Sequence, residues 1–147
     1  MNSQKTLRVG MLGCGVVGSE VARLIVANKS DLAARSGAQL DLVKIGVRNL
    51  SRANVDKALL TTDLEAIVSD PTIDLVIEVI GGIEPARTLI LSAFANGKSV
   101  VTANKALLAK HGGELFAAAD KNGVDLYYEA SVAGAIPILR PLRESLV

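Results

Sequence analysis

The feature that most constrains this chain is the alternation of short apolar runs with segments whose apolar residues recur every three or four positions. Strand-like runs occupy residues 7–12, 40–47, 73–80, 99–102 and 124–128. Helical spacing occupies residues 17–25 and 86–93, the second flanked by Pro85 and Gly97 as at a helix start and end. Strands that alternate with helices pair in parallel, with helices on both faces. The sequence therefore predicts an α/β fold with a doubly wound parallel sheet.

Two segments are less regular. Residues 58–61 favour a short strand and residues 63–69 a helix, whereas residues 137–147 have the apolar spacing of an amphipathic helix in which the chain ends. No internal repeat or linker marks a second domain. We therefore expect residues 1–147 to form one domain, with residues 137–147 beginning a lead-in helix to a further domain.

Composition excludes several classes of protein. A hydrophobic content of 50% excludes intrinsic disorder, and a formal charge of +1 offers no electrostatic attraction to nucleic acid or an anionic membrane. No apolar run approaches the ~18 residues of a membrane-spanning helix. The single cysteine, Cys14, excludes an intramolecular disulfide and favours a cytoplasmic location, where we expect Cys14 to be a small packing residue. The only histidine, His111, precedes Gly112 and Gly113, so we expect it to cap a helix end.

A glycine-rich turn follows the first predicted strand and opens the first predicted helix. Its sequence is Gly13-Cys14-Gly15-Val16-Val17-Gly18. In a dinucleotide fingerprint the first glycine makes a tight turn, the second admits a pyrophosphate and the third lets the helix pack on the strand. The free N–H groups of the helix N-terminus then favour phosphate. The alternative is a turn whose glycines only allow close packing.

The second predicted strand ends in Arg48, where an NAD-binding fold places an acid on the ribose 2′-hydroxyl. An arginine could instead hold a 2′-phosphate through charge-assisted hydrogen bonds, which favours NADP and leaves NAD as the other option. The alternative is an ordinary solvated arginine at a strand end.

Two further predicted strands end in polar or glycine-rich loops, one containing Gly81 and the other containing Thr102 and Lys105. Ligands of open α/β sheets bind beyond the carboxyl ends of the strands, so we expect these loops to flank the nicotinamide. Lys105 is the candidate catalytic cation, because an ammonium group there could hold the ribose or stabilise charge on a substrate oxygen. The alternative is a solvated lysine in the first turn of a helix.

The last predicted strand is followed by Glu129 and a run of small residues up to Pro137. One carboxylate with several main-chain oxygens is the type of ligand set that hard cations prefer. The alternative is a packed turn in which Glu129 is a capping or surface acid.

These motifs together resemble those of the homoserine dehydrogenases. The likeness covers nearly the whole chain and includes Val-Ile-Glu-Val-Ile-Gly-Gly at residues 76–82, Val-Val-Thr-Ala-Asn-Lys at residues 100–105 and residues 128–137. The resemblance implies an NAD(P)-dependent interconversion of L-homoserine and L-aspartate 4-semialdehyde, a cytoplasmic step toward threonine, isoleucine and methionine. It places Val16, Val17, Arg48 and Lys105 on the cofactor. It also places a sodium ion on Glu129 and the main-chain oxygens of Val132, Gly134 and Ile136.

One departure from that family concerns the substrate. Its substrate-binding acid and the lysine proposed for proton transfer lie in a second domain, and this chain ends before that domain. We therefore expect the chain to bind cofactor without turnover, and to self-associate as a homo-oligomer through apolar surface that the second domain would cover. The alternative function is a non-catalytic, NAD(P)-sensing regulatory module, which would have no need of Lys105 near the nicotinamide.

Overall fold

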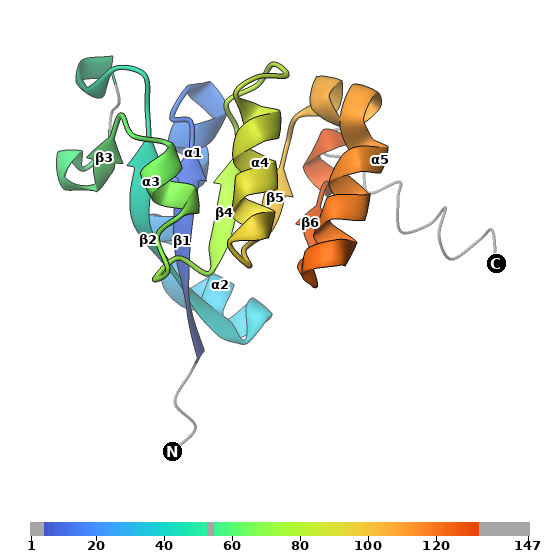
Figure 1. Ribbon diagram of the computed structural model, residues 1–147. Helices are drawn as coiled ribbons and strands as arrows, with labels where there is room; N and C mark the ends of the chain where they lie inside the picture. The colour runs from blue at the N-terminus through green and yellow to red at the C-terminus, as the bar shows by residue number, and fades with distance from the viewer. Residues whose placement is uncertain (1–4, 53–54, 133–147) are drawn as a thin grey trace.

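The structure is a computed structural model that describes residues 5–52 and 55–132 (Figure 1). The sheet has six parallel strands in the order β3-β2-β1-β4-β5-β6. The strands are β1 (Lys5–Leu12), β2 (Ala38–Gly46), β3 (Leu60–Thr61), β4 (Leu75–Glu78), β5 (Ser99–Thr102) and β6 (Leu126–Tyr127). The strand order reverses at β1, which is the order of dinucleotide-binding folds. The predicted doubly wound parallel sheet is therefore confirmed.

Helices cover both faces of the sheet. They are α1 (Val16–Ala27), α2 (Lys29–Ser36), α3 (Glu65–Val68), α4 (Ala86–Ala95) and α5 (Lys105–Asn122), with short 3-10 helices η1 (Leu50–Arg52), η2 (Lys57–Leu59) and η3 (Glu129–Ser131). Figure 1 shows α3, α4 and α5 in front of the sheet and α1 behind it. Gly134, Ile136 and the predicted helix at 137–147 lie outside the described residues.

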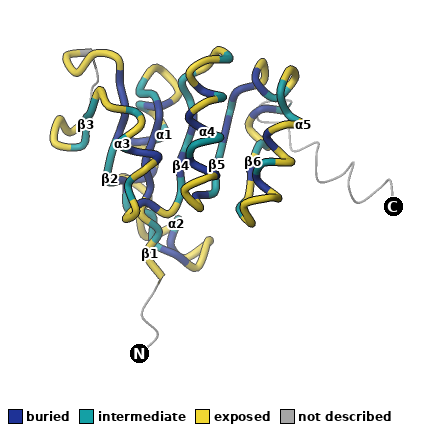
Figure 2. The backbone as a smooth tube through the Cα atoms, in the orientation of Figure 1, coloured by how far each residue is buried: buried dark blue, intermediate teal, exposed yellow. Residues whose placement is uncertain are grey.

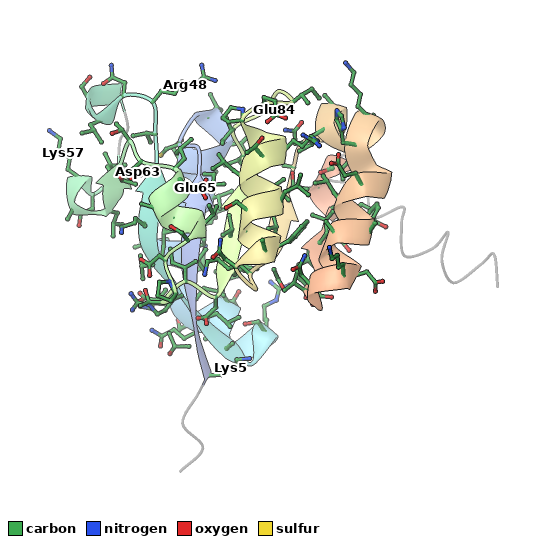
Figure 3. The ribbon with its side chains drawn as sticks, viewed as in Figure 1. Lys5, Arg48, Lys57, Asp63, Glu65 and Glu84 are labelled. Atoms are coloured by element: carbon green, nitrogen blue, oxygen red, sulfur yellow. The ribbon has the colours of Figure 1, made fainter. Side chains whose placement is uncertain are left out.

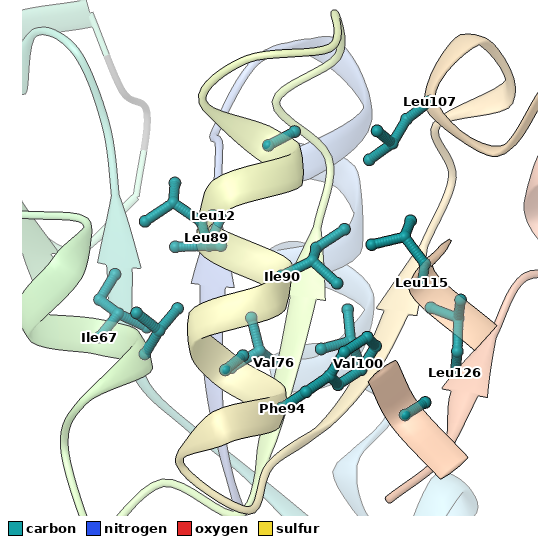
Figure 4. Packing of buried hydrophobic residues seen from close by; sticks show 14 of the residues in the cluster. Leu12, Ile67, Val76, Leu89, Ile90, Phe94, Val100, Leu107, Leu115 and Leu126 are labelled. Carbon is teal, nitrogen blue, oxygen red and sulfur yellow. The ribbon is translucent and has the colours of Figure 1, made fainter. Parts of the chain in front are cut away.

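Each face of the sheet has its own hydrophobic core. The front core joins α4 and α5 to β4 and β5 through fully buried residues such as Ile90, Phe94 and Val100 (Figure 4). The rear core packs Ile25 of α1 against Ile45 of β2 and neighbouring strand residues. In Figure 2 the strands are largely buried, while the helices are exposed on their outer sides. Burial on both faces explains why the strands read as apolar runs rather than alternating ones.

Most predicted elements are present with shifted ends. The strand predicted at 99–102 matches β5, the weak prediction at 58–61 is shortened to β3, and the prediction at 73–80 is shortened to β4. The sequence analysis did not predict helix α2, because most of its residues are polar and only Ala33 is buried, so it has no apolar period. The local signals that could have indicated it are Asp31 in its first turn, Arg35 in its last turn and the left-handed Gly37 that ends it.

The expectation that His111 caps a helix end is wrong. Helix α5 runs from Lys105 to Asn122, so His111, Gly112 and Gly113 lie inside it. Each glycine costs a helix interior about 1 kcal/mol relative to alanine. Burial of Leu107 and Leu115 on either side of the glycines offsets this cost. Within the described residues, no helix is long and apolar enough to cross a membrane.

Candidate cofactor-binding site

The carboxyl ends of four strands meet at one edge of the sheet. The register pairs Leu12 of β1 with Gly46 of β2 and Glu78 of β4, and pairs Glu78 with Thr102 of β5. Because the strands are parallel, the loops that leave these residues are neighbours. The site is built from these loops.

Gly13 and Gly18 make the first loop compact. Gly13 has a φ of 104°, and a Cβ there would lie 2.8 Å from the carbonyl oxygen of Val79. A Cβ at Gly18 would overlap the carbonyl oxygen of Gly13, so only glycine allows α1 to pack this closely on the turn. The first and third glycines therefore have the tight-turn and close-packing roles that the fingerprint requires.

Gly15 differs from both of these glycines. It is the N-cap of α1, with no side-chain cap, and a Cβ there would meet no atom within 4 Å. The two following residues are also unusually exposed, Val16 at 91% and Val17 at 56%. The helix N-terminus thus presents bare backbone N–H groups to an open space, which is the arrangement that binds phosphate.

This open space is part of a cleft of about 580 Å³. Its lining comes from the glycine turn and the start of α1, the end of β2, the residue before α3 and the loop after β4: Gly13, Cys14, Gly15, Val16, Ser19, Gly46, Val47, Arg48, Asn49, Leu64, Val79, Ile80 and Pro85. Burial raises the pKa of the Cys14 thiol, and Cys14 packs against the rear core. This is the behaviour of a packing residue rather than a reactive thiolate.

Arg48 lies where β2 ends, on the same edge of the sheet as the glycine turn. It is exposed, and Figure 3 shows it at the end of the sheet opposite Lys5. The chain turns immediately after it, because Oδ1 of Asn49 accepts hydrogen bonds from the backbone N–H and hydroxyl of Ser51 at 2.9 Å and 2.7 Å. Asn49 lines the cleft, and the segment from Arg48 to Arg52 contains no acid.

The loop after β4 is held by a buried acid, Glu78, which the sequence analysis did not single out. The side chain of Glu78 is fully buried, and its Oε1 accepts from the backbone N–H groups of Ile80 at 2.8 Å and Gly81 at 3.2 Å. Its Oε2 accepts from the hydroxyl of Thr102 at 2.6 Å. The signal that could have indicated Glu78 is one acid inside an apolar run. A buried acid requires hydrogen-bond partners, so such an acid predicts a polar network around it.

Asn104 and Thr102 connect this loop to α5. Nδ2 of Asn104 donates to the carbonyl oxygen of Gly82 at 2.6 Å, and its Oδ1 caps α5 by accepting from the N–H of Leu107 at 3.1 Å. Thr102 is fully buried and binds protein groups on both sides, Glu78 and the N–H of Asn104. Thr102 therefore has no exposed side-chain atom with which to make the predicted contact with the cofactor.

Lys105 is the first residue of α5 and is exposed. In the described part of the chain it forms no salt bridge. It is not among the residues that line the cleft, but it directly follows Asn104, which is bonded to the loop that does. The structure therefore brings Gly13, Gly15, Val16 and Arg48 together in one cleft and places Lys105 beyond its β4-side wall.

The predicted cation site is described only in part. Glu129 is exposed at the start of η3, and Val132 follows that helix, its N–H donating to the carbonyl oxygen of Glu129 at 3.1 Å. Among residues 5–52 and 55–132 no hydrogen bond or salt bridge engages the Glu129 carboxylate.

A charged cluster braces α4 against α5 beside the site. Arg87 forms a two-pronged ion pair with Glu114 and a second ion pair with Glu84 at 3.3 Å. The Arg87 hydrogen bond holds the pKa of Glu114 below its ordinary value, while the Thr88 hydroxyl is the main cause of a lowered pKa at Glu84. Glu84 lies at the same end of the sheet as Arg48 in Figure 3.

Comparison with known proteins identifies the family. A family model described as "Homoserine dehydrogenase, NAD binding domain" matches residues 13–129. A homoserine dehydrogenase of Mycobacterium tuberculosis is 54% identical over 144 residues, which are 97% of this chain and 33% of that protein. The crystal structure of a homoserine dehydrogenase from Thiobacillus denitrificans superimposes with a TM-score of 0.90 at 49% identity, over 97% of this chain and 33% of that one.

A more distant structure shares the fold alone. It is a hyperthermophilic archaeal homoserine dehydrogenase in complex with NADPH, with a TM-score of 0.77 and 23% identity over 95% of this chain and 48% of that one. This chain spans about a third of the length of the curated relatives that it matches. The family match, the identity to relatives and the shared structure lead to one conclusion: the chain belongs to the NAD-binding domain family of the homoserine dehydrogenases.

Proposed function

We propose that this chain binds NADP(H) in the cleft beside Gly15 and forms the cofactor-binding part of an enzyme that interconverts L-homoserine and L-aspartate 4-semialdehyde. The observation that carries the proposal is the open space at Gly15, where a Cβ would meet nothing within 4 Å. The flanking Gly13 and Gly18 are both closely packed. A turn that served packing alone would have no reason for a glycine facing open space at its centre.

The cleft orients the cofactor along the edge of the sheet. The pyrophosphate would lie at the N-terminus of α1, against the backbone N–H groups near Gly15. The adenosine ribose would lie over the end of β2, beside Arg48. The nicotinamide would lie toward the loop after β4 and the start of α5, where Gly81 and Lys105 are. Support for this direction comes from Arg48 at one end of the cleft lining and from Ile80, which precedes Gly81, at the other.

NADP is proposed over NAD because of Arg48. The guanidinium group is exposed at the end of β2, and no acid follows β2 in the segment from Arg48 to Arg52. A dianionic 2′-phosphate would gain charge-assisted hydrogen bonds there.

In its relatives, the matching segment is about a third of a longer protein. The reaction is proposed for such a longer protein. When bound, the nicotinamide supplies or accepts the hydride. This chain binds and orients the cofactor, and Lys105 places a positive charge beside the nicotinamide end, where it can stabilise negative charge on an oxygen. We place this chemistry in the cytoplasm, since one cysteine in 147 residues gives no disulfide framework.

A sodium ion is proposed as a structural ligand of the segment after β6. Glu129 would hold it together with main-chain oxygens of Val132, Gly134 and Ile136, and of these four residues the structure describes Glu129 and Val132. A carboxylate and carbonyl oxygens are ligands suited to a hard cation. The support is that the Glu129 carboxylate is exposed and has no partner among the described residues.

Calorimetric titration of this chain with NADPH and NADH tests the cofactor assignment. We expect NADPH to bind roughly tenfold tighter or more, since hydrogen bonds to a charged group contribute about 1.5–3 kcal/mol. Arg48→Ala should remove that preference, and raising the salt concentration should weaken it. Lys5→Ala is the matched control, because it removes an exposed cation at the opposite end of the sheet. Equal binding of the two cofactors by the unchanged chain would overturn the Arg48 assignment.

Failure of both cofactors to bind would overturn the proposed function itself.

The role of Lys105 is tested by measuring the affinity of the Lys105→Ala variant for nicotinamide-containing cofactors. We expect a loss of affinity for NADPH that Lys110→Ala, a change to another exposed lysine of α5, does not cause. An unchanged affinity for Lys105→Ala would exclude this lysine from the site.

A further inference from the structure

Glu78 is a buried acid whose partners all belong to the β4-side wall of the site. Both of its oxygens are satisfied, one by the N–H groups of Ile80 and Gly81 and the other by the hydroxyl of Thr102. No lysine, arginine or histidine of the described segments forms a salt bridge with it. The loop after β4 and the end of β5 therefore take the place of a cation.

The hydrogen bonds around Glu78 form a closed ring. From Glu78 the ring passes through Thr102 to the N–H of Asn104 at 3.1 Å, and the side chain of Asn104 returns to the loop at the carbonyl oxygen of Gly82. The loop closes the ring by donating the N–H of Gly81 to Glu78. One ring thus joins the loop that borders the cleft to the residue that caps α5.

Packing holds the first part of the loop but not its glycines. Val79 packs against the rear core and Ile80 against the front core, and both line the cleft. Gly81 and Gly82 have φ values of 78° and 76°, and a Cβ at Gly81 would meet nothing within 4 Å, so packing does not hold the loop there. The position of the glycine part of the loop therefore depends on an acceptor beneath it, and Glu78 supplies that acceptor.

We propose that Glu78 is a positioning residue for the nicotinamide half of the cofactor. Glu78 fixes the position of the loop after β4 relative to the start of α5. Glu78 has no exposed surface with which to touch the cofactor itself. It acts through Thr102 and Asn104, the residues that precede Lys105. This inference rests on the proposed function, because it assigns the nicotinamide to that end of the cleft.

A glutamate suits this role better than its amide. Thr102 has one hydroxyl proton, which it donates to Glu78 while accepting from the N–H of Asn104. A carboxylate accepts at both oxygens and so fixes the direction of the hydroxyl. In Glu78→Gln, an amide NH₂ group that faces the loop would lose the two bonds from Ile80 and Gly81. One that faces Thr102 would donate to its hydroxyl, which reverses that bond and leaves the hydroxyl proton without its acceptor.

The test compares two ligands that differ only in the nicotinamide: NADPH and 2′-phospho-ADP-ribose. In Thr102→Val, which keeps the volume and removes the hydroxyl, we expect the affinity for NADPH to fall roughly tenfold. The affinity for 2′-phospho-ADP-ribose should stay within about twofold. Thr102→Ser, which restores the hydroxyl, should recover most of the NADPH affinity. Ser92→Ala is the control, since it removes another hydroxyl-to-carboxylate bond of 2.6 Å, to Glu65, outside the ring.

A second variant and a second readout keep the inference testable if Thr102→Val does not fold. Glu78→Gln should show the same selective loss of NADPH affinity. Without any ligand, it should also shift the backbone amide resonances of Ile80, Gly81 and Lys105 in a ¹⁵N-resolved spectrum while leaving that of Gly15 in place.

Equal losses for both ligands, or no loss for either, would overturn the role of Glu78 while the cofactor site stands. If the unchanged chain binds neither ligand, the proposed function fails instead. The amide shifts then still report whether Glu78 holds the loop and α5 together, and their absence would overturn the ring as well.

Discussion

The two halves of the cleft are built by different means. On the side proposed for the pyrophosphate, backbone makes the site: Gly13 and Gly18 are packed against main-chain atoms, and Gly15 is left bare. On the side proposed for the nicotinamide, buried side chains make it, with Glu78 and Thr102 as the central pair. Backbone geometry that only glycine allows leaves a mark in the sequence, whereas a side-chain network between strands leaves almost none.

Among the variants that test this difference between backbone and side-chain construction, Gly18→Ala should have the largest effect. The added Cβ would overlap the carbonyl oxygen of Gly13, so α1 must move away from the turn. Overpacking of this kind costs about 1–3 kcal/mol of folding stability. We expect both a lower urea midpoint and a loss of NADPH binding. A variant with the stability and affinity of the unchanged chain would show that the third glycine is not required for packing.

Gly15→Ala sharpens the same comparison, because its effect should fall on binding alone. The new Cβ would occupy open space, so stability should change by less than about 1 kcal/mol. The methyl group would keep the pyrophosphate from the α1 N-terminus, and we expect NADPH affinity to fall roughly 10- to 100-fold. Urea unfolding and calorimetry on one sample separate the two quantities. A drop in stability without a drop in affinity would reverse the roles assigned to Gly15 and Gly18.

On the other side of the cleft, Gly113→Ala tests whether α5 is held by packing rather than by local preference. Gly113 is exposed inside α5, and a Cβ there would meet nothing within 4 Å. We expect stability to rise by about 0.5–1 kcal/mol. Gly123→Ala is the contrasting control: Gly123 ends α5 with a φ of 64°, so the same change should destabilise. Thermal unfolding of the two variants should shift in opposite directions.

The smallest expected effect concerns the ion pairs that brace α4 against α5. Arg87 keeps the pKa of Glu114 below its ordinary value of 4.5 in the folded chain. A carboxyl whose folded pKa is lowered contributes stability above its unfolded pKa and loses that contribution as the pH falls through the folded value. Arg87→Gln should therefore be less stable than the unchanged chain at pH 7, with the gap closing below pH 4.5. The exposure of the group keeps the gap small. A gap that widens in acid would contradict this account.

How far the sequence predicts the molecule depends on the kind of signal. The parallel sheet, the role of the glycine turn and the place of Arg48 at the end of β2 all follow from local patterns. The His111 prediction failed because local glycines suggested a helix end, while Leu107 and Leu115 bury the helix on both sides of them. Helix α2 was missed because a mostly polar, exposed helix has no apolar period to detect.

The sequence by itself determined what depends on short-range sterics and hydrophobic period: which segments are buried strands, where the backbone must turn, and that a helix N-terminus faces the carboxyl edge of the sheet. Only the tertiary structure decided which residues meet across strands. Glu78 and Thr102 are 24 residues apart and become partners through the β4–β5 register. Such pairs depend on how strands align in space, and that alignment minimises the free energy of the whole fold rather than of any one segment.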